Sequence, residues 1–324
     1  MISRRVVTLG TAAGLLAASR AADAQPAGKR PLVGVLLPHR LDRDFPAFVG
    51  RLRELGYEDG RNLRLEIRDA GTRLDRLPAL AAELVRMKPA VIVTVNTPPT
   101  RAAINATKEI PIVLTLVGDP VGQGFVKNLS RPGGNVTGRA NLSPDLTAKR
   151  LQLLMEIVPR ARRIAVLFNP DDANTNSQRR EIERVVARID VELQFFPVRR
   201  PDGVAAAFAE LAGWRADAAW WLGGQETALV PPSITQAAAR RLPMMVSQRQ
   251  QVEAGGLLSY IPNAPANYRA AADYVHRILK GAKPGDLPVE QPTEIALSIN
   301  LKTARALGLT LPPSVMVRAT DVFE

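Results

Sequence analysis

Residues 90–108, AVIVTVNTPPTRAAINATK, join an apolar run to a helix-like stretch through a polar turn that contains two prolines. The run from Val91 to Val93 is apolar at every position, which is typical of a parallel strand covered by helices on both faces. Thr97 is placed to cap the helix that follows, and Pro98 suits the first turn of that helix. The stretch therefore predicts one β-α unit of an open α/β sheet.

The same alternation of short apolar runs and longer amphipathic stretches recurs on both sides of this unit. It predicts further strand–helix pairs at 32–37 and 45–55, at 63–68 and 74–87, and at 112–117 and 122–129. After the breaker-rich segment 130–135 the pattern restarts, with strands at 164–168, 191–196, 218–222 and 244–246 and helices at 146–157, 178–189, 204–212 and 233–240. Leftover strands at 257–260 and 295–299 and helices at 268–279 and 301–307 follow.

This order predicts an α/β protein with two doubly wound parallel-sheet lobes, between which the chain crosses several times. Ligands of open α/β sheets bind outside the carboxyl ends of the strands. Two such sheets that face each other therefore predict a cleft at their shared mouth.

The composition is that of an ordinary globular chain of 324 residues, with 46% hydrophobic and 5% aromatic residues. It contains no cysteine, which excludes thiol catalysis, disulfides and thiolate metal sites. The formal net charge is +12, but the basic residues are scattered and aromatic side chains for base stacking are few. We therefore expect no nucleic-acid partner.

The first 24 residues are predicted to be a cleaved signal peptide. Two arginines, Arg4 and Arg5, precede a mild apolar stretch of about thirteen residues, and Ala22–Ala24 has the small-x-small pattern of a cleavage site. A membrane anchor is the less favoured alternative, because a spanning helix needs about twenty apolar residues. The arginine pair resembles a twin-arginine export signal, and the export route stays open.

Cleavage after residue 24 removes three arginines and one aspartate, which lowers the net charge from +12 to +10. We expect the mature chain to be soluble and periplasmic, with no lipid anchor because there is no cysteine to acylate.

Enzyme signatures are missing from the sequence. It has no Gly-x-Ser-x-Gly elbow, no Walker loop and no His-Glu-x-x-His helix, and Gly122-Gln123-Gly124 lacks the third glycine of a dinucleotide fingerprint. The two histidines are His276, on a predicted helix, and His39, directly after a predicted strand. With no base and nucleophile to pair, we expect no catalytic residue, no metal site and no cofactor.

Polar, small or capping residues do recur at the predicted strand ends. Asn96 and Thr97 precede a helix whose N-terminus would suit a carboxylate or other anion, or would simply be capped. In the second half, Asn169 and Asn174 follow a strand and offer amide groups to an amine or hydroxyl, although such residues also build ordinary loops. Polar strand ends in two lobes without catalytic motifs indicate reversible solute capture.

Several segments together resemble the ABC-transporter substrate-binding protein family, whose better-known members bind tryptophan and other aromatic or hydrophobic amino acids. The segments that carry the resemblance are LRELGY at 52–57 with GRN at 60–62, VGDPV at 117–121, RPGGNVTG at 131–138, EAGGL at 253–257 with SY at 259–260, ILKGAKP at 278–284, LPVEQPT at 287–293 and INLKTA at 299–304.

The resemblance implies the type I periplasmic-binding-protein fold, with two lobes joined by a three-segment hinge. The first lobe would comprise residues 30–139 plus 259–285, and the second residues 140–258 plus 286–324. A monomer would enclose a small-molecule solute between the lobes and deliver it to an ABC permease in the inner membrane. The family's pocket positions fall on Pro38, His39, Asn96, Thr97, Thr115, Asp119, Asn169, Asn174, Gln225 and Gln248.

The chain departs from the family pattern at three pocket segments, GGQE at 223–226, SQRQ at 247–250 and SYIPN at 259–263. These amides argue against an aromatic amino acid, and a more polar or more acidic solute is compatible with Arg249, although an arginine in such a loop more often faces solvent. Two alternatives stay open: a clamshell that senses a ligand and signals to a membrane receptor, and an exported enzyme.

Overall fold

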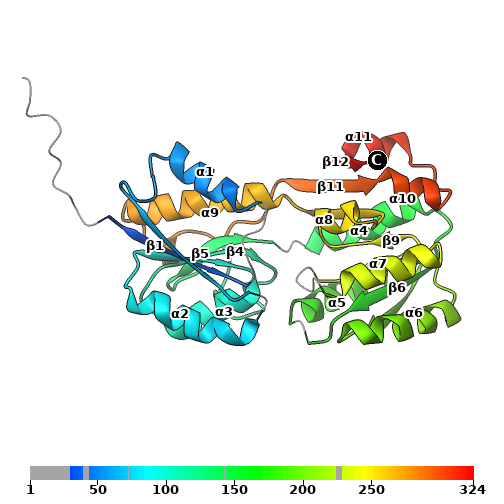
Figure 1. Ribbon diagram of the computed structural model, residues 1–324, viewed down its shortest axis with the longest axis horizontal. Helices are drawn as coiled ribbons and strands as arrows, with labels where there is room; N and C mark the ends of the chain where they lie inside the picture. Colours follow the sequence, from blue (N-terminus) through cyan, green and yellow to red (C-terminus); the bar gives the residue numbers. More distant parts are fainter. Residues whose placement is uncertain are drawn as a thin grey trace, which may run out of the picture.

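Two sheets, each covered by helices on both faces, form two lobes that lie side by side along the long axis of the molecule (Figure 1). The structure is a computed structural model, and it describes residues 30–38, 44–71, 73–141, 144–171, 173–187, 189–223 and 228–324. The predicted signal peptide lies outside these residues. The predicted fold class, α/β with two parallel-sheet lobes, is confirmed.

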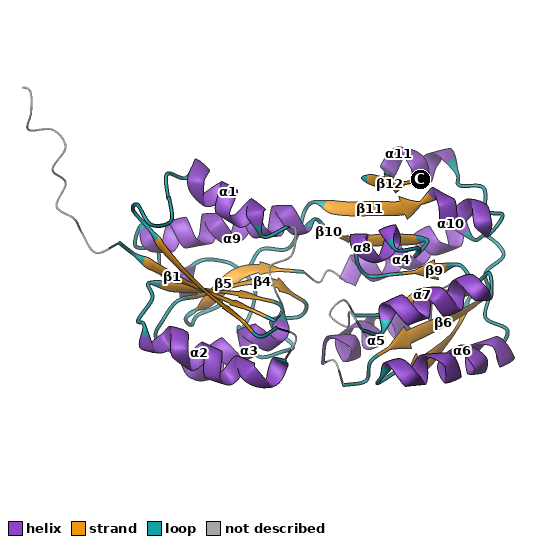
Figure 2. Ribbon diagram, viewed as in Figure 1, coloured by secondary structure: helices purple, strands orange, loops and turns teal. Residues whose placement is uncertain are grey.

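The first sheet is fully parallel, with the strand order β2-β1-β3-β4-β5. Its strands are β1 (Leu32–Leu37), β2 (Arg64–Asp69), β3 (Val91–Val95), β4 (Ile112–Val117) and β5 (Val136–Ala140). Helices α1 (Pro46–Glu54) and α9 (Ala264–Leu279) cover one face, and α2 (Leu77–Arg86) and α3 (Thr97–Ala106) cover the other (Figure 2). Side chains alternate between these layers along β1, because Val35 packs with α1 and α9 while Leu36 packs with α2.

The second sheet has the order β12-β11-β10-β9-β8-β6-β7 and is parallel except where β11 runs antiparallel to β10. Its strands are β6 (Arg163–Phe168), β7 (Glu192–Pro197), β8 (Ala218–Trp221), β9 (Met244–Met245), β10 (Leu258–Pro262), β11 (Ile295–Asn300) and β12 (Asp321–Phe323). One face packs against α4 (Pro144–Ile157), α5 (Ala173–Val186), α10 (Leu301–Ala306) and α11 (Pro313–Arg318). The other packs against α6 (Val204–Gly213), α7 (Val230–Ala239) and α8 (Arg249–Glu253).

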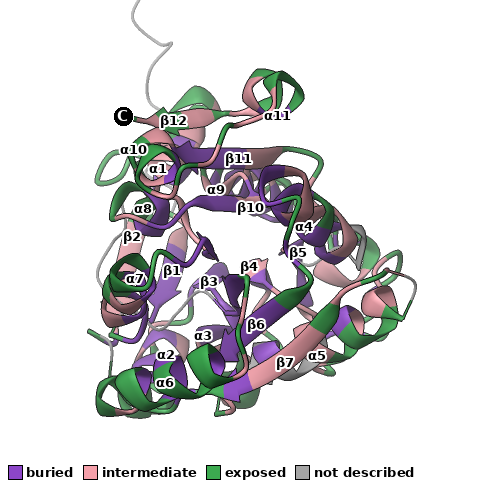
Figure 3. Ribbon diagram, turned by 90° about the vertical axis from the view of Figure 1, so that its right-hand side faces the viewer, coloured by how far each residue is buried: buried purple, intermediate pink, exposed green. Residues whose placement is uncertain are grey.

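Burial follows these layers, since the strands of both sheets are mostly buried while the helices expose their outer faces (Figure 3). Short 3-10 turns occur at Leu74–Arg76, Pro201–Gly203 and Pro284–Asp286. Within the described ranges, no helix is long and apolar enough to cross a membrane.

The chain passes between the two sheets three times: after β5, after β10 and before β11. Two of the predicted lobe boundaries differ from these crossings. β10 pairs with β9 and β11, so residues 259–262 belong to the second sheet and not to the first lobe. Residues 286–290 remain with the first lobe, where the Val289 amide donates to the Leu129 carbonyl at 2.7 Å and the Ala140 amide donates to the Glu290 carbonyl at 2.8 Å. Backbone pairing therefore places these two limits a few residues later than the boundaries that the family resemblance implies.

One predicted helix is wrong, since residues 122–129 form a series of turns. Gly124 has a positive φ of 70°, and the Asp119 carboxylate accepts a hydrogen bond from the Gly122 amide at 2.8 Å, which closes a tight turn in place of a helix. Strand β5, helices α8 and α11 and strand β12 were not predicted from the sequence.

Helices α1 and α9 are linked by a cluster of ion pairs on the surface, which lowers the pKa of Glu54. Arg269 donates to both Glu54 carboxylate oxygens at 2.8 and 2.7 Å, and Arg51 donates to Glu54 at 2.9 Å and to Asp273 at 2.8 Å. Hydrogen bonds from Arg269 first, and from Arg51 second, lower the pKa of Glu54 from 4.5 to about 2. Because the folded-state pKa is lowered, the stabilisation is present above pH 4.5 and is lost as the pH falls towards 2.

We expect the Glu54 carboxyl carbon to titrate near pH 2 by NMR, and its pKa to rise in an Arg269→Gln variant. A midpoint near 4.5 in the unmodified protein would show that the cluster does not persist in solution.

Candidate ligand-binding site

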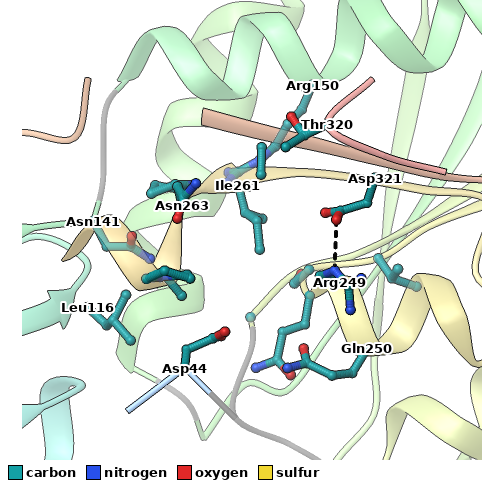
Figure 4. A pocket seen from close by; sticks show the side chains of 18 of the residues that line it. Asp44, Leu116, Asn141, Arg150, Arg249, Gln250, Ile261, Asn263, Thr320 and Asp321 are labelled. Carbon is teal, nitrogen blue, oxygen red and sulfur yellow. Dashed lines mark ion pairs between the residues drawn. The ribbon is translucent and has the colours of Figure 1, made fainter. Parts of the chain in front are cut away.

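A cavity of about 560 Å³ lies between the lobes, at the mouth formed by strand ends of both sheets. Asn96 follows β3 and Leu116 lies near the end of β4 in the first lobe, while Trp220 lies in β8 and Val246 follows β9 in the second. Figure 4 shows Asp44 and Leu116 across the cavity from Arg150 and Thr320. The cleft predicted from the strand-end rule is therefore present, and both lobes and two crossings contribute to its walls.

The first lobe presents two residues with strained backbones to this cavity, Asn96 with φ 71° and Leu116 with φ 57°. The other described non-glycine residues with positive φ are Lys88, Arg215 and Arg241, which each lie two residues beyond a helix end, where this conformation is ordinary. Such conformations cost about 1–3 kcal/mol each and cluster at functional sites. The strain at Leu116 coincides with a register shift between β4 and β5, which places this side chain in the cavity wall.

A chain of threonine hydroxyls holds the turn at Asn96. The hydroxyls of Thr94 and Thr100 lie 2.7 Å apart, and Thr100 donates to the Asn96 carbonyl at 2.8 Å. Helix α3 begins at Thr97, so the N-cap residue is Asn96 and not Thr97 as predicted. The buried hydroxyl pair is satisfied internally and fixes the position of Asn96 at the mouth.

Of the ten pocket residues expected from the sequence, Asn96 and Gln248 line the cavity. Pro38, Thr97 and Thr115 are buried and do not line it, and the Thr115 hydroxyl donates to the Asn267 carbonyl at 3.4 Å.

Two further expected residues accept hydrogen bonds within their own loops and do not line the cavity between the lobes. The Asn169 side chain accepts from the Asp171 amide at 2.9 Å. Asp119 accepts from Gly122 and lines a separate cavity of about 500 Å³, together with Arg180 and Arg184 of α5. His39, Gln225 and the side chain of Asn174 lie outside the described residues.

Two polar lining residues come from the crossings: Asn263, which lies in the pocket segment 259–263 identified from the sequence, and Asn141, which sequence reasoning missed. Asn141 follows β5, and its side-chain oxygen accepts from the amide of the buried Asn267 at 3.3 Å. Asn263 follows β10 and caps α9, where it accepts from the Ala266 amide at 3.1 Å. A polar residue directly after a strand that changes lobe was the available signal for Asn141, but β5 was not predicted.

Four described charged side chains line the cavity: Asp44, Arg150, Arg249 and Asp321. Arg249, which the departures from the family pattern singled out, pairs with Asp321 at 3.0 Å and Glu253 at 3.6 Å. Its guanidinium also stacks over the Phe323 ring at 4.8 Å. The charge of Arg249 is therefore balanced within the second lobe.

Arg150 was not selected from the sequence. Its Nε donates to the Tyr260 carbonyl at 2.7 Å, which ties α4 to β10. Burial lowers the pKa of Arg150 to about 10, so the residue stays cationic at neutral pH.

Two parallel-sheet α/β lobes around a cleft at their strand ends define a bilobed protein of the type I periplasmic-binding-protein class. The family model for ABC transporter substrate binding proteins matches residues 38–323, and the chain belongs to this family.

Similar proteins match this chain over most of its length. A tyrosine-binding protein of Clostridioides difficile (strain R20291) is 30% identical over 272 residues, which cover 83% of this chain and 77% of that protein. The crystal structure of a conserved domain protein from Vibrio cholerae has 31% identity and a TM-score of 0.83, and it covers 91% of this chain and 100% of its own. A Streptococcus pneumoniae ABC domain in complex with L-Trp has 25% identity, a TM-score of 0.83 and the same coverage.

Proposed function

We propose that the mature chain is the periplasmic solute-binding component of an ABC importer, which captures an amino acid or small organic acid and delivers it to an inner-membrane permease without chemical change. The observation that carries this proposal is the cavity of about 560 Å³ with walls from both lobes. Its volume lies in the range of about 300–1,000 Å³ that is usual for small-molecule sites.

The proposed mechanism of capture depends on the fact that both lobes contribute residues to the cavity wall. Asn96 and Leu116 belong to the first lobe, whereas Gln248 and Arg150 belong to the second, so a solute that touches both sets stabilises a closed arrangement. The relatives that bind tyrosine or hold L-Trp support a solute of this size. Export by the N-terminal signal, cleavage after residue 24, a monomeric state and the absence of a lipid anchor are parts of the same proposal.

The direct test is a thermal-shift screen of residues 25–324 against amino acids, aromatic acids, dicarboxylates, nucleosides and sugars, with hits confirmed by calorimetry. A ligand at a hundred times its dissociation constant should add about 2.7 kcal/mol of stability. One-to-one binding with recovery of the unchanged ligand is the expected result. A ligand that is recovered chemically altered would instead favour an exported enzyme.

Ligand binding is also expected to change intrinsic tryptophan fluorescence. The chain has three tryptophans, and among them only Trp220 lines the cavity. Trp220 is 2% exposed, and a bound ligand would replace the solvent next to it in the cavity. Its emission should therefore shift in proportion to the fraction of protein that has ligand bound. The signal should disappear in a Trp220→Phe variant and persist in a Trp214→Phe variant; the reverse pattern would place the ligand elsewhere.

A further inference from the structure

We propose that Arg150 recognises a carboxylate group of the ligand, and that the cleft selects monocarboxylates over neutral solutes of the same shape. This inference rests on the proposed solute-binding function and names its substrate class. It follows from the contacts of Arg150, from the charge balance of the cavity and from the position of α4.

Arg150 is a cation whose charge the protein does not balance. Among the described residues, no carboxylate pairs with it, and its one hydrogen bond joins Nε to the Tyr260 carbonyl at 2.7 Å. Arg249 shows the contrast, since two carboxylates and an aromatic ring surround it. A half-buried guanidinium without a counter-ion costs free energy, part of which a bound anion would recover.

The geometry of this single bond leaves a defined binding edge. A guanidinium has five N–H donors in a rigid fork, and the bond from Nε to β10 fixes the plane of the group. The terminal pair of nitrogens remains available, and that pair matches the two oxygens of a carboxylate. Arg150 lines the cavity beside Thr320 and Ile261, so this edge belongs to the same wall (Figure 4).

The charges around the cavity favour a single negative charge. Among the described lining residues, Arg249 is paired with Asp321, whereas no carboxylate pairs with Arg150. One cation without a carboxylate partner balances one negative charge, so a dianion such as a phosphate ester would keep its second charge unbalanced. A monocarboxylate, with or without an ammonium group elsewhere in the molecule, fits this balance.

The position of Arg150 also connects recognition to closure. Its partner Tyr260 lies in β10, two residues before the crossing at Pro262 and Asn263. A carboxylate bound to Arg150 would therefore contact the second lobe close to the crossing between the lobes. Asn96 and Leu116 line the same cavity from the first lobe, so they can contact the other end of the ligand when the lobes close.

The test compares acids with their own carboxamides, which keep the shape and remove the charge. The probes are L-tyrosine, L-tryptophan and benzoate against tyrosinamide, tryptophanamide and benzamide, with a neutral sugar panel, measured by calorimetry on the mature chain. We expect the best acid to bind about 10- to 100-fold more tightly than its amide, as charge-assisted hydrogen bonds imply.

Variants assign this preference to Arg150. Arg150→Gln should abolish the preference for acid over amide, and Arg150→Lys should keep part of it, because the charge remains but the fork is lost. Lys149→Gln is the matched control: it removes one charge from the adjacent position, whose ammonium donates to Gln152 at 3.1 Å on the surface, and should leave the preference intact. Because Arg150→Gln also removes the hydrogen bond to the Tyr260 carbonyl, urea denaturation of the variant without ligand shows whether it is folded when its affinities are compared.

Three results would overturn the assignment: equal affinity for acid and amide, an unchanged preference in Arg150→Gln, or tighter binding of a phosphorylated or sulfonated analogue. If sugars or amides bind and no acid does, the carboxylate site is wrong while solute capture stands. If no solute of either kind binds, both proposals fail.

Discussion

Replacement of Gly138 by alanine is expected to destabilise the first lobe by about 3–5 kcal/mol, a loss typical of severe steric and backbone strain. Gly138 has φ 135°, and a Cβ atom there would lie 2.1 Å from the Leu114 carbonyl oxygen and 2.8 Å from the Leu114 amide nitrogen. These are backbone atoms of the paired strand β4, so no side-chain rotation relieves the overlap. The Gly138 carbonyl also accepts from the Glu290 amide at 3.0 Å, which attaches a crossing segment to the same strand.

Gly134→Ala is the matched control for this variant. It makes the same change four residues earlier, where a Cβ atom would meet nothing within 4 Å. Urea denaturation of both variants, followed by circular dichroism, measures the difference in the free energy of unfolding. A Gly138→Ala protein as stable as Gly134→Ala would mean that β5 does not approach β4 as closely as the structure shows.

Strand β5 also marks the limit of fold prediction from this sequence. The apolar runs at 32–37 and 112–117 predict β1 and β4 with their observed bounds, because central parallel strands must be apolar on both faces. The sequence of β5, VTGRA, contains a glycine and an arginine and has no such run. It is buried by its neighbours: Thr137 donates to the Leu287 carbonyl at 2.8 Å, across 150 residues of chain. Only tertiary pairing makes this segment a strand.

The candidate site likewise contains some residues that could be predicted from the sequence and others that could not. Asn96 and Gln248 were predicted because the strand-end rule depends only on where a strand stops. Arg150 lies inside an amphipathic helix, where an arginine ordinarily faces solvent, and reaches the cavity because α4 packs against β10, 110 residues further along the chain. Leu116 is turned into the wall by a register shift that leaves no trace in the local residue pattern. Long-range packing and strain therefore place the residues that sequence reasoning missed.

Substitutions of the two neighbouring tryptophans Trp220 and Trp221 should affect stability and ligand affinity differently. Trp220 and Trp221 are adjacent in β8 and point to opposite faces, as their alternation along a strand predicts. Trp220 packs with Met245 and Leu258 and lines the cavity, whereas Trp221 is fully buried among Phe208 and the residues around it on the other face. Either change to alanine should cost about 3–5 kcal/mol of stability, because each empties a large buried volume.

The conservative changes to phenylalanine should differ. The Trp221 Nε1 is buried and, among the described residues, has no hydrogen-bond partner, so Trp221→Phe removes a desolvated donor and should cost less than about 1.5 kcal/mol. That variant should keep the ligand affinity of the unmodified chain. Trp220→Phe should stay folded but bind the ligand found in the screen about tenfold more weakly, because the cavity wall loses part of the indole contact area. Calorimetry on both variants decides the matter, since equal affinity losses would mean that the ligand does not contact the face of β8 that carries Trp220.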